Sequence, residues 1–326
     1  MLNLFRQNTL FAGILTVLLA AALRIPEFLS PHNYSFIKNA PFSALIFNFI
    51  ENLGNPTFWV ITGNIFLVST QAILINYISS RHDILYKDTY MPGLMFVLLS
   101  SIFPEQTELT PQLVSNLFVM FLLLRLCYLY ESANPLLLML DSGFYLGVGL
   151  LFNYDLIIFL PFILISVIIF TSFNLRYLIV SVLGIALPIY LTVGVFYLTD
   201  HLNELMGYVK QSFEKNILRA AINRVDYLVP FAIIFPVSVV SGFNLQQNFF
   251  RNKVKTRRII QTLALMLLFG VAGLFVENTN FVYALYYLNV PLAIIFGYFF
   301  ISDKRFLLKE GLFLLLILFV FYFKYL

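Results

Sequence analysis

The segments LIIFLPFILISVIIF (156–170) and LRYLIVSVLGIALPIYLTVGVFYL (175–198) decide the fold class of this chain. A helix that crosses a bilayer needs about 20 mainly apolar residues, with a range of about 17–25. Only the short sequence TSFN (171–174) separates the two segments. They therefore predict two membrane-spanning helices joined by a tight turn.

The composition of the whole chain extends this interpretation beyond the two segments. The 326 residues are 60% hydrophobic and 11% charged, whereas soluble globular proteins have roughly 45–50% apolar and about 25% charged residues. So few charged side chains cannot cover a surface that faces water. A soluble enzyme, a disordered chain and a nucleic-acid-binding protein are therefore excluded. We expect an all-α, polytopic transmembrane helix bundle that forms a single domain over residues 1–326.

Apolar segments of suitable length predict about eleven membrane crossings. The first resembles a signal peptide, with Arg6 before an apolar stretch, but the apolar pattern resumes afterwards and favours an uncleaved helix. The third has a short apolar centre, from Met91 to Phe103. The predicted spans are 9–29, 57–79, 88–104, 112–131, 134–152, 155–173, 175–199, 227–243, 259–276, 281–301 and 311–326.

The distribution of basic residues predicts the orientation of the bundle. Cytoplasmic loops of membrane proteins carry an excess of Lys and Arg. With the N-terminus placed in the cytoplasm, 13 of the 20 basic residues fall inside, including the cluster from Arg251 to Arg258. Without the third crossing this cluster would move outside. The charge pattern thus supports eleven spans and a cytoplasmic N-terminus. We expect the bundle to lie in the inner membrane of a bacterium.

Two long loops, 30–56 and 200–226, both fall on the outer side of this topology. In the second, residues such as Leu202, Leu205 and Val209 recur with a helical period, and charged residues lie off this stripe. Such a pattern is typical of an amphipathic helix in the membrane interface. The alternative is a loop that packs against the bundle and binds no ligand.

Polar residues inside the predicted spans need partners. Arg125 and Asp141 lie about eight residues on either side of a predicted turn, so both reach the same depth. We expect a structural ion pair, with snorkelling of Arg125 or a proton relay as alternatives. Four amide side chains also fall within the spans, Asn64, Gln71, Asn76 and Asn116. We expect them to form hydrogen bonds between helices, with the lining of a pore as the alternative.

The outer face is the predicted working face. Arg24, Arg219 and Arg224 stay outside against the topology rule, and a guanidinium group binds phosphate oxygens through two parallel hydrogen bonds. Glu27 is our first candidate for a catalytic base and Glu105 our second. The alternative is that exposed loops are simply polar.

This arrangement resembles the polyprenyl-phosphate-sugar glycosyltransferases of the GT-C superfamily. The segment Arg24-Ile25-Pro26-Glu27 stands where their first outer loop begins, and the resemblance implies catalytic acids in the outer loops. The whole chain also resembles an uncharacterised family of multi-pass membrane proteins from Bacteroidota. The segments LFRQN (4–8), QAILIN (71–76), MPGL (91–94) and LLSSIFP (98–104) carry that resemblance.

These observations leave three function classes open. The first is an enzyme or binder that acts on a lipid-linked sugar or another envelope lipid at the periplasmic face. The second is a non-catalytic subunit of an envelope complex, and the third is a transporter. We expect membrane lipids, including a polyprenyl-phosphate lipid, and membrane proteins as partners. We expect no cofactor and no metal site, because one cysteine and three scattered histidines offer no ligand motif.

Overall fold

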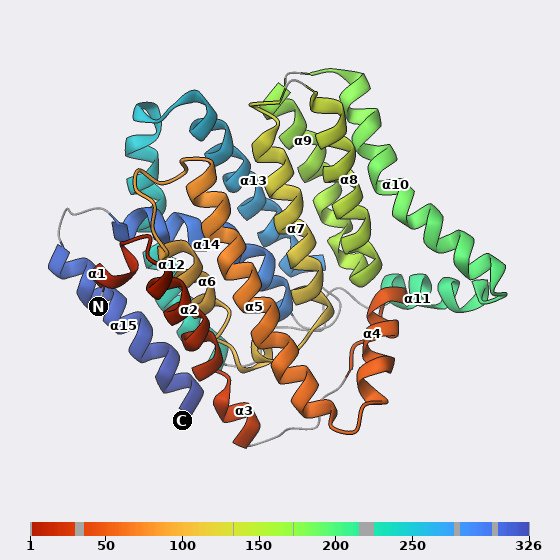
Figure 1. The fold of residues 1–326 in the computed structure, drawn as a ribbon, viewed down its shortest axis with the longest axis horizontal. Helices are drawn as coiled ribbons and strands as arrows, with labels where there is room; N and C mark the ends of the chain where they lie inside the picture. The colour runs from red at the N-terminus through yellow and green to blue at the C-terminus, as the bar shows by residue number, and fades with distance from the viewer. Residues whose placement is uncertain are drawn as a thin grey trace.

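The computed structural model describes residues 2–29, 36–132, 134–171, 173–214, 225–276, 281–301 and 306–325, and within these ranges the chain is helical without strands (Figure 1). The α-helices are α1 (Leu2–Phe5), α2 (Leu10–Ala22), α3 (Ile25–Leu29), α4 (Pro41–Glu51), α5 (Pro56–Arg81), α6 (Met91–Leu99), α7 (Pro111–Tyr128), α8 (Pro135–Phe152), α9 (Phe159–Thr171), α10 (Leu175–Leu198), α11 (Leu202–Glu214), α12 (Val225–Asn248), α13 (Val254–Val276), α14 (Phe281–Ile301) and α15 (Phe306–Tyr325). Three short 3-10 helices connect them, η1 (Pro104–Thr107), η2 (Tyr154–Ile158) and η3 (Phe249–Arg251).

Proline and small polar residues start many of these helices. The first residue of α4, α5, α7 and α8 is proline, whose fixed φ suits a first helical turn and whose missing N–H has no partner there in any case. Thr9 and Thr110 accept hydrogen bonds from the first turns of α2 and α7, and Asn174 does so for α10. These caps explain why the apolar segments begin where they do.

Eight segments of the described chain are long and apolar enough to cross a membrane: Leu10–Phe28, Pro56–Arg81, Pro111–Tyr128, Pro135–Phe152, Tyr154–Thr171, Leu175–Leu198, Val254–Val276 and Phe281–Ile301. Helices α12 and α15 have 24 and 20 residues, which is also the length of a membrane-spanning helix. The predicted third span differs, because α6 has only nine residues, all of them buried. It ends where the hydroxyls of Ser100 and Ser101 bond back to the carbonyl of Val97.

Helix α14 is the centre of the bundle. Of its most apolar 18-residue stretch, 94% is buried, and it packs against α6, α7, α12 and α13. A helix that is apolar all round and buried all round belongs to a core rather than to a lipid-facing surface. The main hydrophobic cluster accordingly includes Tyr286, Phe296 and Phe300 of α14.

Helices α8 and α10 pack closely through glycine. A Cβ atom added to Gly143 would lie 2.1 Å from the carbonyl oxygen of Ser181, and one added to Gly184 would lie 2.3 Å from that of Leu140. Small residues allow membrane helices to approach this closely. This glycine contact holds α10 against α8, although α9 separates them in sequence.

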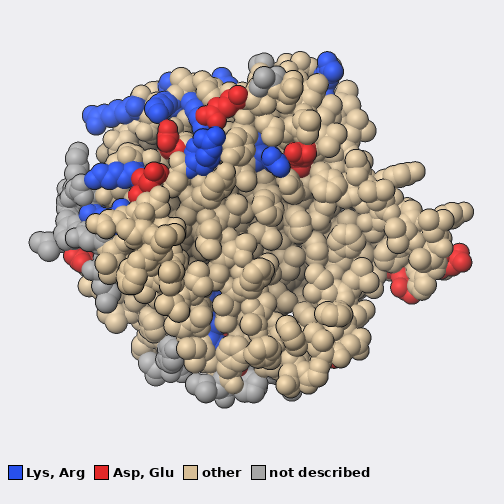
Figure 2. All heavy atoms as spheres, in the orientation of Figure 1, with Lys and Arg blue, Asp and Glu red and all other residues tan. Residues whose placement is uncertain are grey.

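The two ends of the bundle differ. Basic residues gather at the end that is uppermost in Figure 2. We call this the basic end and define it by Arg81 in the last turn of α5 and by Lys253, Lys255, Arg257 and Arg258 at the start of α13, which ion pairs join to the residues after α5 and α7. Helices α4 and α11 lie towards the other end, and α11 runs across the direction of the long helices (Figure 1). We call that the α4–α11 end. Helix α4 falls within the predicted outer loop 30–56 and α11 within 200–226.

Candidate functional site

Arg24 is the most deeply buried charged residue at the α4–α11 end. Its exposed fraction is 0%, because it follows α2 and lies between α5 and the segment after α6. The guanidinium group donates hydrogen bonds to four acceptors: Ala20 O at 3.0 Å, Ser101 Oγ at 3.3 Å, Ser100 O at 3.5 Å and the side-chain oxygen of Asn64. All four acceptors are neutral. Among the residues that the structure describes, no carboxylate lies within ion-pair distance of Arg24.

Asn64 connects this arginine to the next polar groups. Its amide nitrogen donates to the carbonyl oxygens of Gln106 at 3.2 Å and Glu108 at 2.5 Å. The hydroxyl of Tyr286 also donates to Gln106 O, and Gln106 in turn donates to Val282 O at 3.0 Å. The result is a buried polar network that joins α2, α5, η1 and α14. Such a network fixes one arrangement of helices when its members are satisfied.

The two candidate bases lie beside this network. Glu27 is half-buried in α3, and its Oε1 accepts a hydrogen bond of 2.9 Å from the hydroxyl of Thr107. Glu105 is half-buried and belongs to the same 3-10 turn as Thr107. The fold therefore brings Arg24, Glu27 and η1, which carries Glu105, to one end of the bundle. Arg219 and Arg224 lie outside the described residues.

The Arg125–Asp141 pair joins α7 to α8. Arg125 Nε lies 3.5 Å from Asp141 Oδ2, with exposed side-chain fractions of 36% and 28%. Arg125 also lies 6.0 Å above the ring of Tyr145. The pair thus sits on the flank of the hairpin rather than in its interior. Since Arg125 of α7 contacts Asp141 and Tyr145, both on α8, this geometry suits a structural ion pair that holds the two helices together.

The amides of the spans make the hydrogen bonds between helices that their sequence positions favoured. Asn116 donates to Gln71 Oε1 at 2.8 Å, and Gln71 donates to Leu113 O at 2.7 Å. Asn76 Oδ1 accepts from Gly93 N at 2.8 Å. Their role as links between helices is confirmed. Tyr286 and Gln106 were missed, because a tyrosine near a span end or a glutamine in a loop gives no signal of burial.

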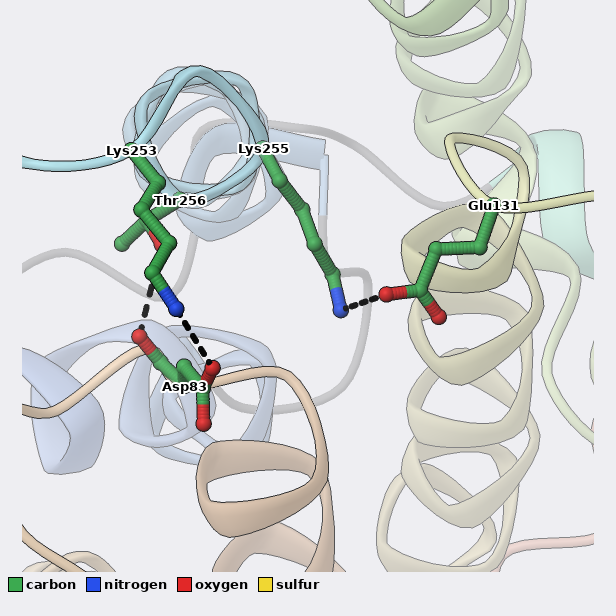
Figure 3. A network of polar contacts seen from close by, with 5 residues as sticks. All are labelled: Asp83, Glu131, Lys253, Lys255 and Thr256. Carbon is green, nitrogen blue, oxygen red and sulfur yellow. Dashed lines mark hydrogen bonds and ion pairs between the residues drawn. The ribbon is translucent and has the colours of Figure 1, made fainter.

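A second polar cluster ties three helices together at the basic end (Figure 3). Lys253 Nζ lies 3.2 Å from Asp83 Oδ2, and Lys255 Nζ lies 2.7 Å from Glu131 Oε1. Thr256 donates to Asp83 O at 3.3 Å. Asp83 follows α5, Glu131 follows α7, and the other three residues flank or begin α13. The hydrogen bond from Lys255 lowers the pKa of Glu131.

His82 lies under this cluster. It is fully buried, and its ring meets that of Tyr128 edge-on at 4.6 Å between centroids. Neither ring nitrogen has a hydrogen-bond partner within the described ranges. Burial lowers the pKa of His82 to about 4, and the nearby Lys255 contributes to the shift. The imidazole is therefore neutral at pH 7.

The arrangement contains no metal-binding group of the usual kind. In the part of the chain that the structure describes, no three His, Cys, Asp or Glu side chains come together as ligands. The single cysteine, Cys127, is buried. The polar groups of the described residues thus include a buried arginine network, half-buried carboxylates and a cluster of ion pairs.

Comparison with known proteins adds a family and no activity. No curated protein and no solved structure matches the chain. These comparisons therefore do not test the resemblance to glycosyltransferases or the assignment to Bacteroidota. One family model matches residues 1–326, and its description is "Family of unknown function (DUF6427)". Because the match covers the whole chain, the protein belongs to the DUF6427 family.

Proposed function

We propose that this protein is a multi-pass protein of a bacterial inner membrane, with eleven crossings and the basic end in the cytoplasm. The third crossing is made by the short helix α6 together with the residues that lead from it to η1. The support is the gathering of Arg81, Lys253, Lys255, Arg257 and Arg258 at one end of the bundle (Figure 2). Cytoplasmic loops are enriched in such residues because translocating them is unfavourable. Reporters inserted after Lys87 and Arg258 should give cytoplasmic signals. One inserted after Lys215 should give an external signal, and a cytoplasmic signal there would refute the orientation.

We further propose that the protein binds an envelope lipid with an anionic head group at its α4–α11 end, and that a lipid-linked sugar is the preferred class. The observation that carries this proposal is the placement of α4 and α11. Both lie at this end, and they present large apolar side chains to the surroundings. Phe49 is 67% exposed and Met206 is 58% exposed. Exposed apolar groups on a helix along the membrane interface are suited to contact acyl chains.

The polar network beside these helices limits which cations a lipid head group can reach. Four of the five N–H donors of Arg24 already bond to Ala20, Asn64 and the two serines, so a phosphate would have to displace protein acceptors to make a two-pronged contact. Its buried positive charge still acts over distance, because the surrounding medium screens it poorly. The cations that remain for direct contact include Lys38, which pairs with Glu51 at 2.5 Å, the exposed Lys210 of α11, and the sequence-assigned Arg219 and Arg224.

Lipid analysis of the purified protein tests this proposal. Extraction and mass spectrometry should find a phosphate-bearing lipid with the wild-type chain. Replacing Arg219 and Arg224 with Gln should reduce it strongly, and so should Phe49→Ser. The matched controls are Arg176→Gln and Phe173→Ser, which remove an exposed cation and an exposed aromatic ring away from this end. Lipid content unchanged in the α4–α11 variants would refute the proposal and favour the non-catalytic subunit.

The same samples separate binding from catalysis. If the bound lipid is converted to a product, and if Glu27→Gln or Glu105→Gln stops conversion while lipid is retained, the enzyme alternative replaces simple binding. Retention of unchanged lipid in these variants and in the wild type supports binding alone.

A further inference from the structure

Helices α12 and α13 enclose an apolar groove with α14 as its floor. The two helices are consecutive in the chain, yet over the described residues both pack against α14 and only sparsely against each other. Leu245 and Phe249 form one wall, Ala264 and Leu267 form the other, and Ile295 lies beneath. The cavity has a volume of about 280 Å³. This is just below the usual range of pockets that take a whole small molecule, about 300–1,000 Å³.

The side chains that line the groove determine which kind of molecule can bind in it. Apart from Gln246 and Gln261, the lining side chains are apolar, and ordered water needs two to four polar partners. An unfilled groove would deprive its lining of dispersion contacts. A hydrocarbon chain satisfies both conditions, because it fills the volume and needs no hydrogen bonds. Gln246 and Gln261 are both exposed, and they offer amide groups where a chain would meet its polar ester linkage.

Two arginines stand at the end of this groove. Arg257 lies on α13 one helical turn before Ile260 and Gln261, so it belongs to the groove face of that helix. Its Nε atom is buried without a hydrogen-bond partner. Arg251 ends η3, two residues after Phe249, and is exposed. No carboxylate in the described ranges lies within ion-pair distance of either guanidinium.

These arginines contrast with their basic neighbours. Lys253 and Lys255 are engaged by Asp83 and Glu131 (Figure 3), so their charges are already neutralised. Arg257 and Arg251 have no such carboxylate among the described residues, so they place positive charge at the mouth of the groove. Basic pockets between transmembrane helices attract anionic lipid head groups, and a guanidinium group matches a phosphate in geometry.

We infer that the α12–α14 groove binds one acyl chain of an anionic glycerophospholipid, whose phosphate contacts Arg257 and Arg251. The lipid belongs to the leaflet on the basic side of the bundle. The site is separate from the α4–α11 end, and it stands whether or not that end binds a lipid.

Titration of the full-length protein with defined lipids tests the inference. The protein is delipidated in a neutral detergent, and native mass spectrometry then measures binding of phosphatidylglycerol and of phosphatidylcholine with identical chains. We expect phosphatidylglycerol to bind at least about fivefold more tightly, since each cation near the phosphate contributes roughly that factor. Arg257→Gln should reduce this preference about fivefold, and Arg176→Gln, an exposed cation on α10, should not. Equal affinity of the wild type for both lipids would overturn the head-group assignment.

A second pair of variants tests the acyl-chain contact. Ala264→Trp fills the groove and should reduce binding of both lipids by tenfold or more. Ala186→Trp places the same side chain on the exposed face of α10 and should leave binding unchanged. Retained lipid binding by folded Ala264→Trp would overturn the inference.

A photoreactive lipid supplies a test on the wild-type chain, which is independent of whether any variant folds. Phosphatidylglycerol with a diazirine in its acyl chain should label peptides that contain Gly242–Phe249 and Ile260–Leu267. Labelling spread evenly over the exposed faces of α5 and α10 would overturn the site. Loss of lipid at the α4–α11 end in the Arg219 and Arg224 variants, with this labelling intact, distinguishes the two proposals.

Discussion

The glycine contact between α8 and α10 predicts a sharp difference between two substitutions in one helix. In Gly184→Ala the new methyl group would lie 2.3 Å from the carbonyl oxygen of Leu140 and 3.0 Å from the backbone nitrogen of Phe144. In Gly194→Ala, ten residues further along α10, the methyl group meets nothing within 4 Å. The first change disturbs a helix contact and the second does not.

The expected loss of stability of Gly184→Ala follows from how far the new methyl group falls short of a normal contact distance. Cβ atoms essentially never approach another heavy atom within 3.0 Å, so α8 and α10 must separate by about 0.7 Å or more at this point. A backbone carbonyl cannot rotate away as a flexible side chain does. A gap of 0.5–1 Å forfeits about a quarter to a half of the attraction between packed atoms. Overpacking of this kind costs about 1–3 kcal/mol, and we expect Gly184→Ala to fall within that range.

Gly194→Ala provides the matched control. Alanine in the middle of a helix is favoured over glycine by about 0.5–1 kcal/mol, so this variant should unfold at or above the wild-type midpoint. Unfolding by SDS titration of the protein in mixed micelles measures both variants. Equal midpoints for Gly184→Ala and Gly194→Ala would refute the close contact. Gly143→Ala, which meets Ser181 O at 2.1 Å, should behave as Gly184→Ala does.

Three other predictions concern polar groups. Asn64→Leu removes an acceptor from the buried Arg24 and one hydrogen bond from each of the carbonyl oxygens of Gln106 and Glu108. It should therefore destabilise the protein by about 3 kcal/mol in the same titration, and the control Thr62→Val, on the exposed side of α5, should not. Asp141→Asn should destabilise by about 1–3 kcal/mol, and addition of Arg125→Gln should restore part of this, whereas full stability of Asp141→Asn would argue against a structural tie. His82 has a folded pKa of about 4 against an unfolded value of about 6.5, so the unfolded state takes up the proton first and stability falls as the pH drops from 6.5 towards 4. Between pH 7.5 and pH 5 the loss should be about 2 kcal/mol, and His82→Phe should remove this component.

Sequence alone was sufficient for the fold class and for several local features. Apolar segments with few charges leave a membrane bundle as the only stable arrangement, because backbone polar groups in lipid must be satisfied within helices. The period of residues 202–217 predicted an amphipathic helix, and α11 occupies Leu202–Glu214. Arg125 and Asp141 lie at similar distances before and after the same turn between two helices. This predicted their approach, since two helices joined by a tight turn run side by side. Each of these inferences depends on near neighbours in the chain.

Tertiary structure decided the rest, because burial depends on which helices meet. Sequence assigned Arg24 to an exposed outer surface, yet packing against α5 and the residues after α6 buries it completely and directs its hydrogen bonds to neutral acceptors. The third span was expected over 88–104, but α6 is a nine-residue helix enclosed on every side. The groove at Ala264 exists only because α12 and α13 both pack on α14 instead of on each other. No local pattern encodes that choice, since an apolar helix face fits lipid and another helix equally well.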